Sequence, residues 1–201
     1  MTGSRTFVVA VTGASGVVYG VRLIKALLEQ QMTVAAVLSN AGVKVLAHEM
    51  GYDPEIGFSR FLKAYGVQAE HLENLSVFSQ DQIAAPPASG SFRHDGMVVV
   101  PCSMKTLAGA AAGYADNLIT RACDVTLKER RPVILVPRET PMNLIHLENM
   151  VRLTRAGAVI LPASPSFYSF PDTLDTLVDT VVARILDHLG VAQTLMPGWG
   201  E

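Results

Sequence analysis

Short apolar runs alternate along this chain with stretches in which apolar residues recur every three or four positions. The first run covers residues 7–11, is rich in valine and ends at a turn of small residues. In the stretch that follows, the apolar positions on one helical face are Val17, Val21, Ile24 and Leu28. A short run before a turn predicts a buried strand, and the periodic stretch predicts an amphipathic helix. The chain therefore opens with a strand, a turn and a helix.

The same unit recurs toward the C-terminus. Further strands are predicted over residues 32–39, 97–101, 133–136 and 158–161. Helices are predicted over residues 56–65, the alanine-rich residues 107–115, and residues 142–155 and 172–189. Two further helices are predicted with polar caps: one begins after Asn40, and the other begins after Asp116 and runs through residue 130. Strands that alternate with helices imply right-handed crossovers. The pattern predicts an α/β fold, an open, mostly parallel Rossmann-like sheet with helices on both faces, in a single domain over residues 1–201.

Composition narrows the class of protein. Of the 201 residues, 49% are hydrophobic and 17% are charged, the net charge is −2, and the mean hydropathy is +0.30. The net charge gives no electrostatic basis for binding nucleic acid. Glycine and proline interrupt the long uncharged stretches, so no membrane span is predicted. The apolar excess indicates buried parallel strands and a subunit interface, which predicts a homo-oligomer.

Cysteine and histidine usage favours a cytoplasmic protein without a bound metal. Cys102 and Cys123 are too few for a disulfide framework, and the five histidines show no ligand spacing. The N-terminus leads into the first strand with no signal peptide. Cys102 ends a predicted buried strand, and we interpret it as a small core residue rather than a nucleophile.

The turn after the first strand is typical of a phosphate-binding loop. Gly13 and Gly16 permit a close approach of the backbone, and Ser15 offers a hydroxyl. Glycines at 13, 16 and 20 do not form G-x-G-x-x-G, and Ser39 stands where a dinucleotide site needs an acid for the ribose. We therefore expect one phosphate at the N-terminus of the first helix, which indicates a mononucleotide rather than NAD.

Polar residues follow all five predicted strands at the edge where open α/β sheets bind ligands. They are Thr12 with its turn, Ser39, residues 103–106, Arg138 with Glu139, and residues 164–168. One Ser or Thr at such a place is more often a helix cap, but five loops at one edge indicate a site. Arg138 lies between two prolines after a buried strand, which favours a contact with phosphate or carboxylate.

Two further cations, Lys128 and Arg184, lie on predicted helices. Lys128 belongs to a Lys-Glu-Arg-Arg sequence at the end of a helix, where a cation complements the helix dipole. Arg184 lies on the last helix and either pairs there with Asp179 or Asp187 or faces a ligand.

Several segments, in order along nearly the whole chain, resemble the UbiX-type flavin prenyltransferases, a flavoprotein family formerly named aromatic-acid decarboxylases. The most specific are Lys-Glu-Arg-Arg-Pro at 128–132 and Pro-Arg-Glu-Thr-Pro at 137–141. The others are residues 12–16, 101–107, 157–163, 167–168 and 182–186. The resemblance implies transfer of a dimethylallyl group from dimethylallyl monophosphate to N5 and C6 of reduced FMN, without a metal. The prenylated FMN would serve a UbiD-type decarboxylase, and the assembly would be a dodecamer built from trimers.

The resemblance also implies roles for individual residues. The FMN-binding residues would be Gly13, Ala14, Ser15, Ser39, Ser103, Met104, Lys105, Thr106, Arg121 and Arg138. Catalytic roles would fall to Ser15, Glu49 and Glu139, with Glu139 moving a proton. Lys128, Arg138, Tyr168 and Arg184 would hold the substrate phosphate, because charge-assisted hydrogen bonds of about 1.5–3 kcal/mol each can replace a magnesium ion. Trp199, in a tail (190–201) expected to pack near the active site, would face the allyl cation with Tyr168.

Two alternatives stay open at this point. One is an FMN-dependent decarboxylase of cysteine-type substrates with the same fold, which Pro141-Met142-Asn143 faintly resembles. Its early active-site histidine has no convincing counterpart, because His48 lies within a predicted helix. The other is a non-catalytic flavin-binding subunit. The sequence also leaves three points open. These are whether the donor is a monophosphate or a pyrophosphate, which decarboxylase receives the product, and whether the pathway makes ubiquinone or degrades aromatic acids.

Overall fold

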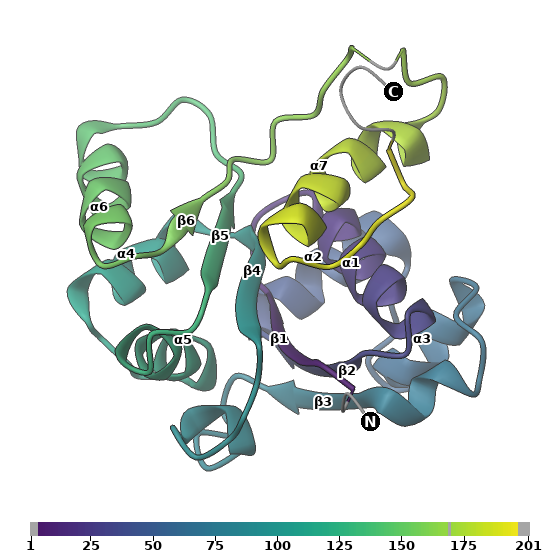
Figure 1. The fold of residues 1–201 in the computed structure, drawn as a ribbon, viewed down its shortest axis with the longest axis horizontal. Helices are drawn as coiled ribbons and strands as arrows, with labels where there is room; N and C mark the ends of the chain where they lie inside the picture. The colour runs from purple at the N-terminus through teal and green to yellow at the C-terminus, as the bar shows by residue number, and fades with distance from the viewer. Residues whose placement is uncertain (1–3, 169, 197–201) are drawn as a thin grey trace.

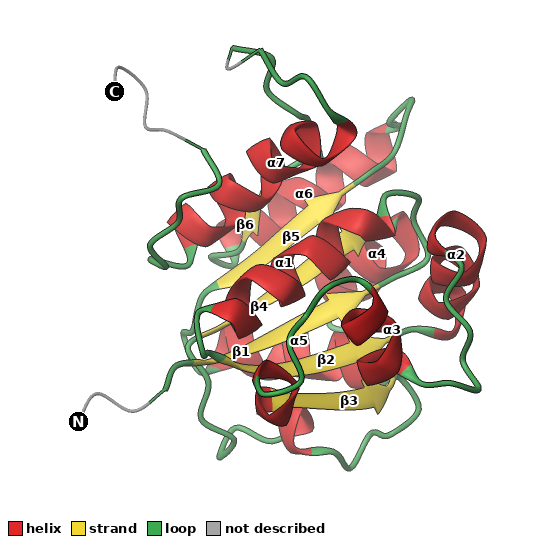
Figure 2. Ribbon diagram, turned by 90° about the vertical axis from the view of Figure 1, so that its right-hand side faces the viewer, coloured by secondary structure: helices red, strands yellow, loops and turns green. Residues whose placement is uncertain are grey.

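A six-stranded sheet forms the centre of the molecule in a computed structural model, which describes residues 4–168 and 170–196. Its strands are β1 (Thr6–Val11), β2 (Thr33–Leu38), β3 (Leu75–Ser79), β4 (Gly96–Cys102), β5 (Val133–Pro137) and β6 (Val159–Ile160). They lie in the order β3-β2-β1-β4-β5-β6 (Figure 2), and every pairing is parallel. The predicted fold class is confirmed.

Helices cover both faces of this sheet (Figure 1). They are α1 (Val17–Glu29), α2 (Asn40–Met50), α3 (Phe58–Ala64), α4 (Met104–Ala112), α5 (Leu118–Lys128), α6 (Leu144–Arg155) and α7 (Leu174–His188), with 3-10 turns η1 (His71–Asn74) and η2 (Pro86–Ala88). One core packs the sheet against α1, α2, α3 and α7. The other core packs it against α4, α5 and α6. Within the described residues, no helix is long and apolar enough to cross a membrane.

The strand side chains divide between the two cores in alternation, as the pleat requires. In β1, Phe7 and Val9 enter the first core, whereas Val8 and Ala10 enter the second, and all four are fully buried. Because both faces are covered, these strands read as continuous apolar runs. That property made the central strands recognisable in the sequence.

Strand β3 was missed by the sequence analysis, which predicted five strands. It is the edge strand beyond β2, and all five of its residues are half-buried or exposed. An edge strand needs no continuous apolar run, so its pattern resembled a polar loop.

Two predicted helix caps were displaced by one residue. Ser39, not Asn40, caps α2, since Ser39 Oγ accepts a 2.8 Å hydrogen bond from Gly42 N. Asn117, not Asp116, caps α5. Asp116 instead accepts from the Asn117 side chain. The other predicted elements differ from the structure at their ends by a few residues, as helix and strand termini commonly do.

The order of the strands reverses at β1, because β2 pairs with one side of β1 and β4 pairs with the other. The C-terminal ends of β1 and β4 are tied together by Thr12, which is fully buried. Thr12 Oγ1 donates to Pro101 O at 2.7 Å and accepts from Ser103 N at 2.8 Å. Ligands of open α/β sheets bind at this switch in strand order.

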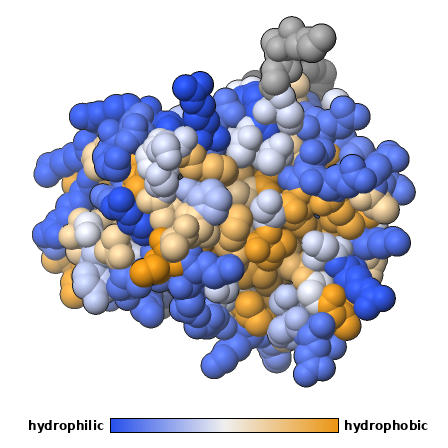
Figure 3. Space-filling view, turned by 90° about the horizontal axis from the view of Figure 1, so that it is seen from below, coloured by the Kyte–Doolittle hydropathy of each residue, from blue (hydrophilic) through white to orange (hydrophobic). Residues whose placement is uncertain are grey.

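Not all apolar surface is covered within one chain. Figure 3 shows hydrophobic residues gathered across the middle of one face and framed by hydrophilic ones. Helix α6 exposes Leu144, Ile145, Leu147 and Val151, with exposed fractions of 47–69%. Exposed apolar areas of this kind mark interaction sites on soluble proteins.

Helix α1 lies against the backbone of β4 at Gly20. A Cβ added to Gly20 would collide with the carbonyl oxygen of Val100. We expect Gly20→Ala to lower the free energy of unfolding by roughly 1–2 kcal/mol, because overpacking of about 1–3 kcal/mol exceeds the helix propensity gained. Urea denaturation measures the change.

The control is Glu29→Ala on the same helix, which removes the partly exposed ion pair with Lys25 and should cost no more than about 0.5 kcal/mol. A Gly20→Ala protein as stable as the control would contradict the close packing of α1 on β4.

Candidate active site

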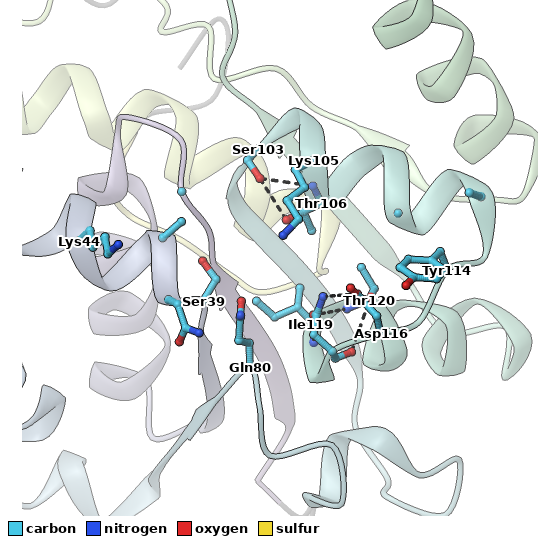
Figure 4. A pocket seen from close by; sticks show the side chains of 16 residues that line it. Ser39, Lys44, Gln80, Ser103, Lys105, Thr106, Tyr114, Asp116, Ile119 and Thr120 are labelled. Carbon is cyan, nitrogen blue, oxygen red and sulfur yellow. Dashed lines mark hydrogen bonds between the residues drawn. The ribbon is translucent and has the colours of Figure 1, made fainter.

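A pocket of about 590 Å³ opens at the C-terminal edge of the sheet, between the first turns of α2, α4 and α5. The side chains that line it converge from these elements (Figure 4). The lining residues are Gly13, Ser39, Asn40, Ala41, Lys44, Gln80, Ser103, Lys105, Thr106, Gly109, Ala112, Tyr114, Asp116, Asn117, Ile119 and Thr120. The volume is in the range of small-molecule sites.

Three helix N-termini meet at this pocket, each with a side-chain cap. Ser39 caps α2, Ser103 Oγ accepts from Thr106 N at 3.3 Å, and Asn117 Oδ1 accepts from Ile119 N at 2.9 Å. The remaining first-turn amides of a helix have no partner within it and carry partial positive charge. Such termini bind phosphate. Lys44 and Lys105 add two full charges at the wall.

The rest of the wall suits the less polar part of a nucleotide. Ile119, Ala112 and Gly109 offer apolar contact, and Tyr114 adds an exposed aromatic ring. Gly13 brings the first turn directly against α2, since a Cβ there would collide with the Ala41 Cβ. The pocket can therefore hold a mononucleotide that has its phosphate at the helix termini.

The turn at residues 12–16 continues from this pocket to a second polar group, which we call the turn cluster: Ser15, Glu49, Arg138 and Glu139. Glu49 Oε2 accepts from Gly16 N at 2.9 Å and from Val17 N at 3.2 Å. Arg138 Nε donates to Ser15 O at 3.1 Å. An acid from α2 and a cation from the end of β5 thus bracket the turn.

Glu49 changes the interpretation of the α1 terminus. The sequence analysis expected a phosphate on these amides, but the structure places the Glu49 carboxylate on Gly16 N and Val17 N. Gly16, the cap position of α1, has φ 95° and supplies no side-chain cap, so Glu49 takes that role from another helix. The anion-binding termini left for a nucleotide are those of α2, α4 and α5.

Glu139 follows Arg138 and accepts from Thr140 N at 3.0 Å through its own carboxylate. Tyr168 lies on the segment after β6, which begins at the same edge of the sheet, and is 77% exposed. The connections after β1 and β5, together with Glu49 of α2, therefore supply the turn cluster, and the connection after β6 carries Tyr168.

Two predicted phosphate-binding cations lie elsewhere in the chain. Lys128 is the last residue of α5, and Thr120 at the other end of that helix lines the pocket. At 1.5 Å of rise per residue, the two residues lie about 12 Å apart along the helix axis. The Nζ of Lys128 donates to Glu129 at 2.6 Å. Arg184 lies in the last turns of α7 and pairs with Asp187 at 2.9 Å. Asp187 was one of the two partners considered, whereas Asp179 pairs with Arg22.

The end of α7 is at the opposite edge of the sheet from the pocket. Arg5, just before β1, donates to Leu189 O and Gly190 O beyond that helix. Within one chain, Lys128 and Arg184 are therefore not gathered with Arg138 and Tyr168.

Only some of the predicted FMN-binding residues line the pocket. Gly13, Ser39, Ser103, Lys105 and Thr106 line the pocket. Ala14, Ser15, Met104 and Arg138 are neighbours in sequence of lining residues or belong to the turn cluster. Arg121 lies on α5, where it donates to Ala88 O and pairs with Asp124. Trp199 lies outside the described residues, so its role and that of the tail stay predictions.

Several lining residues were missed by the sequence analysis. Gln80 follows β3, the strand that was not predicted, and its backbone oxygen accepts from Leu118 N at the start of α5. Lys44 lies one turn into α2, and Tyr114 and Asp116 lie in the connection before α5. The Ser39 cap could have pointed to Lys44, because it fixes which face of α2 turns to the pocket. The others depend on tertiary contacts.

Neither cysteine is suited to act as a nucleophile. Cys102 and Cys123 are buried, and burial raises the pKa of the Cys102 thiol and raises that of Cys123 to about 12. Only the thiolate attacks, so both thiols are inert at neutral pH. Among the described residues, no group of three or more His, Cys, Asp or Glu side chains could hold a metal ion.

The sequence matches the Flavoprotein family model over residues 1–186. It is 47% identical over 206 residues to flavin prenyltransferase UbiX of Pseudomonas aeruginosa, with 100% of this chain and 97% of the relative covered. The chain belongs to the flavin prenyltransferase family. The resemblance drawn from the motifs is thereby confirmed, and it extends over the whole sequence.

Solved structures of this family agree with the fold. AnUbiX, crystallised in complex with FMN and dimethylallyl pyrophosphate, has a TM-score of 0.87 and 40% identity, with 98% of each chain covered. A dodecameric FMN-dependent UbiX-like decarboxylase from Escherichia coli O157:H7 has a TM-score of 0.86 and 41% identity, with 98% of this chain and 100% of that chain covered.

The Glu49 carboxylate caps α1, and its loss should be measurable as stability. We expect Glu49→Ala to lower the free energy of unfolding by about 1 kcal/mol, the usual effect of removing a helix cap. Thermal or urea denaturation checks this. Glu55→Ala, at an exposed acid outside the site, is the control and should change stability little. Equal stability of the two variants would show that the Glu49 contacts contribute nothing.

Proposed function

We propose that this protein joins the dimethylallyl group of dimethylallyl monophosphate to N5 and C6 of reduced FMN, and so makes prenylated FMN for a UbiD-type decarboxylase. The observation that carries the proposal is the pocket at three helix N-termini, which lies beside the turn cluster in a chain of the flavin prenyltransferase family. The pocket fits the mononucleotide, and the turn cluster supplies charged and proton-carrying groups next to it.

FMN would bind with its phosphate at the first turns of α2, α4 and α5, near Lys44 and Lys105. Ser39 Oγ and Ser103 Oγ already accept from helix amides. The Ser39 hydroxyl hydrogen is available to donate, whereas Ser103 Oγ also shares a 3.1 Å hydrogen bond with Thr106 Oγ1. The flavin would extend along the turn at Gly13, which lines the pocket. When bound, reduced FMN supplies the nucleophilic nitrogen and carbon.

The turn cluster would act on the prenyl phosphate. Arg138 is held by the Ser15 carbonyl in a loop at the end of β5, where its remaining guanidinium donors can bind the departing phosphate. Glu139 would accept the proton that C6 of the flavin loses, and Ser15 would assist. Proton transfer by a positioned carboxylate contributes roughly 10²–10⁴ in rate.

The homo-oligomer completes the cation set in this proposal. Lys128 and Arg184 lie away from the turn cluster of their own chain, so they would reach the phosphate from neighbouring copies. The exposed apolar face of α6 and a groove of about 440 Å³ beside it, lined by residues such as Leu147, Val151 and Ile160, supply an interface. A dodecameric relative at 41% identity supports an assembly of that size.

The cysteine-type decarboxylase remains the less favoured function. It would not use a prenyl phosphate, whereas a cation such as Arg138 and a proton carrier such as Glu139 suit the departure of phosphate. A non-catalytic flavin subunit would need neither residue.

The reaction is tested by mass spectrometry of the flavin after anaerobic incubation of the protein with reduced FMN. Dimethylallyl monophosphate and dimethylallyl pyrophosphate are offered in separate samples. We expect the flavin to gain one prenyl group with the monophosphate. Glu139→Gln keeps the shape of the side chain and should bind FMN almost normally, while product forms roughly 10²–10⁴ times more slowly.

Glu55→Gln is the control and should react at the wild-type rate. No prenylated flavin with either donor would refute the proposed function. Wild-type rates in Glu139→Gln would remove the proton-transfer role and assign it to Ser15 or the substrate phosphate.

The oligomer is tested at α6. We expect light scattering of the wild type at micromolar concentration to give a multiple of the 21.5 kDa chain mass. Val151→Asp places a charge on the apolar face without disturbing the core, since Val151 is 47% exposed, and should shift the mass toward the monomer with loss of prenyl transfer. Ile56→Asp, at a similarly exposed residue in another region, is the control. A fully active monomer would contradict shared active sites.

A further inference from the structure

Thr180 on α7, a residue that the proposed function does not use, holds the segment that carries Tyr168. Ser166 N donates a 3.0 Å hydrogen bond to Thr180 Oγ1. Earlier in the segment, Ala163 N donates to Pro137 O at the end of β5. The Thr180 contact therefore comes two residues before Tyr168 and three residues after the bond from Ala163 to the end of β5.

Thr180 is built to accept this bond. Its residue is 4% exposed, and its hydroxyl donates to Leu177 O at 2.7 Å. With its one hydrogen directed at the helix, the oxygen presents a lone pair to Ser166 N. Removal of the hydroxyl would leave a partly buried N–H without its partner, which costs more than an average hydrogen bond contributes.

Asp179, the residue before Thr180, fixes the position of this part of α7. Asp179 is 6% exposed and accepts two hydrogen bonds from one guanidinium, from Arg22 Nε at 2.6 Å and from Arg22 Nη2 at 2.7 Å. A bidentate pair of this kind fixes geometry as well as proximity. Because Arg22 lies on α1, the pair fixes α7 relative to the helix that begins at the turn cluster.

These contacts form a continuous connection between two parts of the site. It runs from the turn at residues 12–16 through α1 and Arg22 to Asp179, and from the adjoining Thr180 to Ser166. A shift of α7 would move the Tyr168 segment relative to that turn.

We propose that Thr180 is a positioning residue for prenyl transfer, whose hydroxyl orients the Tyr168 segment, with the Arg22–Asp179 pair holding that hydroxyl in place. The inference rests on the proposed function and on the contact with the substrate phosphate that the family resemblance implies for Tyr168. Thr180 acts through the segment and does not touch the substrate.

Initial rates of prenyl transfer, measured anaerobically with saturating reduced FMN, test this role. Thr180→Val keeps the shape of the side chain and removes the hydroxyl. We expect its KM for dimethylallyl monophosphate to rise about tenfold, equivalent to about 1.4 kcal/mol, with kcat within about twofold and FMN affinity unchanged. Thr180→Ser restores the hydroxyl and should return KM to within about twofold of wild type.

The ion pair is tested by a matched pair of variants on α1. Arg22→Gln should raise KM in the same direction as Thr180→Val. Lys25→Gln removes a partly exposed contact with Glu29 on the same helix and should leave KM unchanged.

Hydrogen–deuterium exchange provides a readout that does not depend on the reaction. The Ser166 amide should exchange slowly in the wild type and in Thr180→Ser, and at least tenfold faster in Thr180→Val. Faster exchange together with a raised KM supports the proposal. Wild-type KM in Thr180→Val overturns it while the proposed function stands. A wild-type protein that binds FMN but forms no prenylated product refutes the proposed function, and the positioning role with it.

Discussion

The buried hydroxyl of Thr12 is the contact on which the site depends. It joins the C-terminal ends of β1 and β4, where the connections leave the sheet toward opposite faces, by donating to Pro101 O and accepting from Ser103 N. These bonds place the first turn of α4 beside the turn at residues 12–16. Without these hydrogen bonds, the loops that follow the strands at this edge would not be joined to one another. With the two ends held together, helix N-termini from both sides face one pocket.

Electrostatics divide the site into two parts. The pocket offers helix termini and lysines to an anion, whereas the α1 terminus is already neutralised by Glu49. A second phosphate would therefore depend on full charges such as that of Arg138. This division suits the proposed reaction of two phosphorylated reactants, because each phosphate would have its own cations and the departing phosphate would not compete with the nucleotide.

Much of the fold could be predicted from the sequence because the central strands are buried on both faces. Residues such as Val8 and Val9 are apolar in succession only because each has a helix layer above or below it. Strand β3 escaped detection because it is an edge strand, and Gln80 was missed with it. Ser39 and Ser103 were found through their place after strands, and both proved to be helix caps that also line the pocket.

The sequence by itself determined the α/β class, the family and most of the polar residues at the strand ends, because periodicity and motifs are local properties of the chain. Only the tertiary structure decided how those residues are grouped. It assigned Glu49 to the α1 terminus, separated Lys128 and Arg184 from the turn cluster, and joined Arg22 to Asp179 across 157 positions of sequence. Contacts between distant segments follow from how helices pack on the sheet, and no local pattern records that packing.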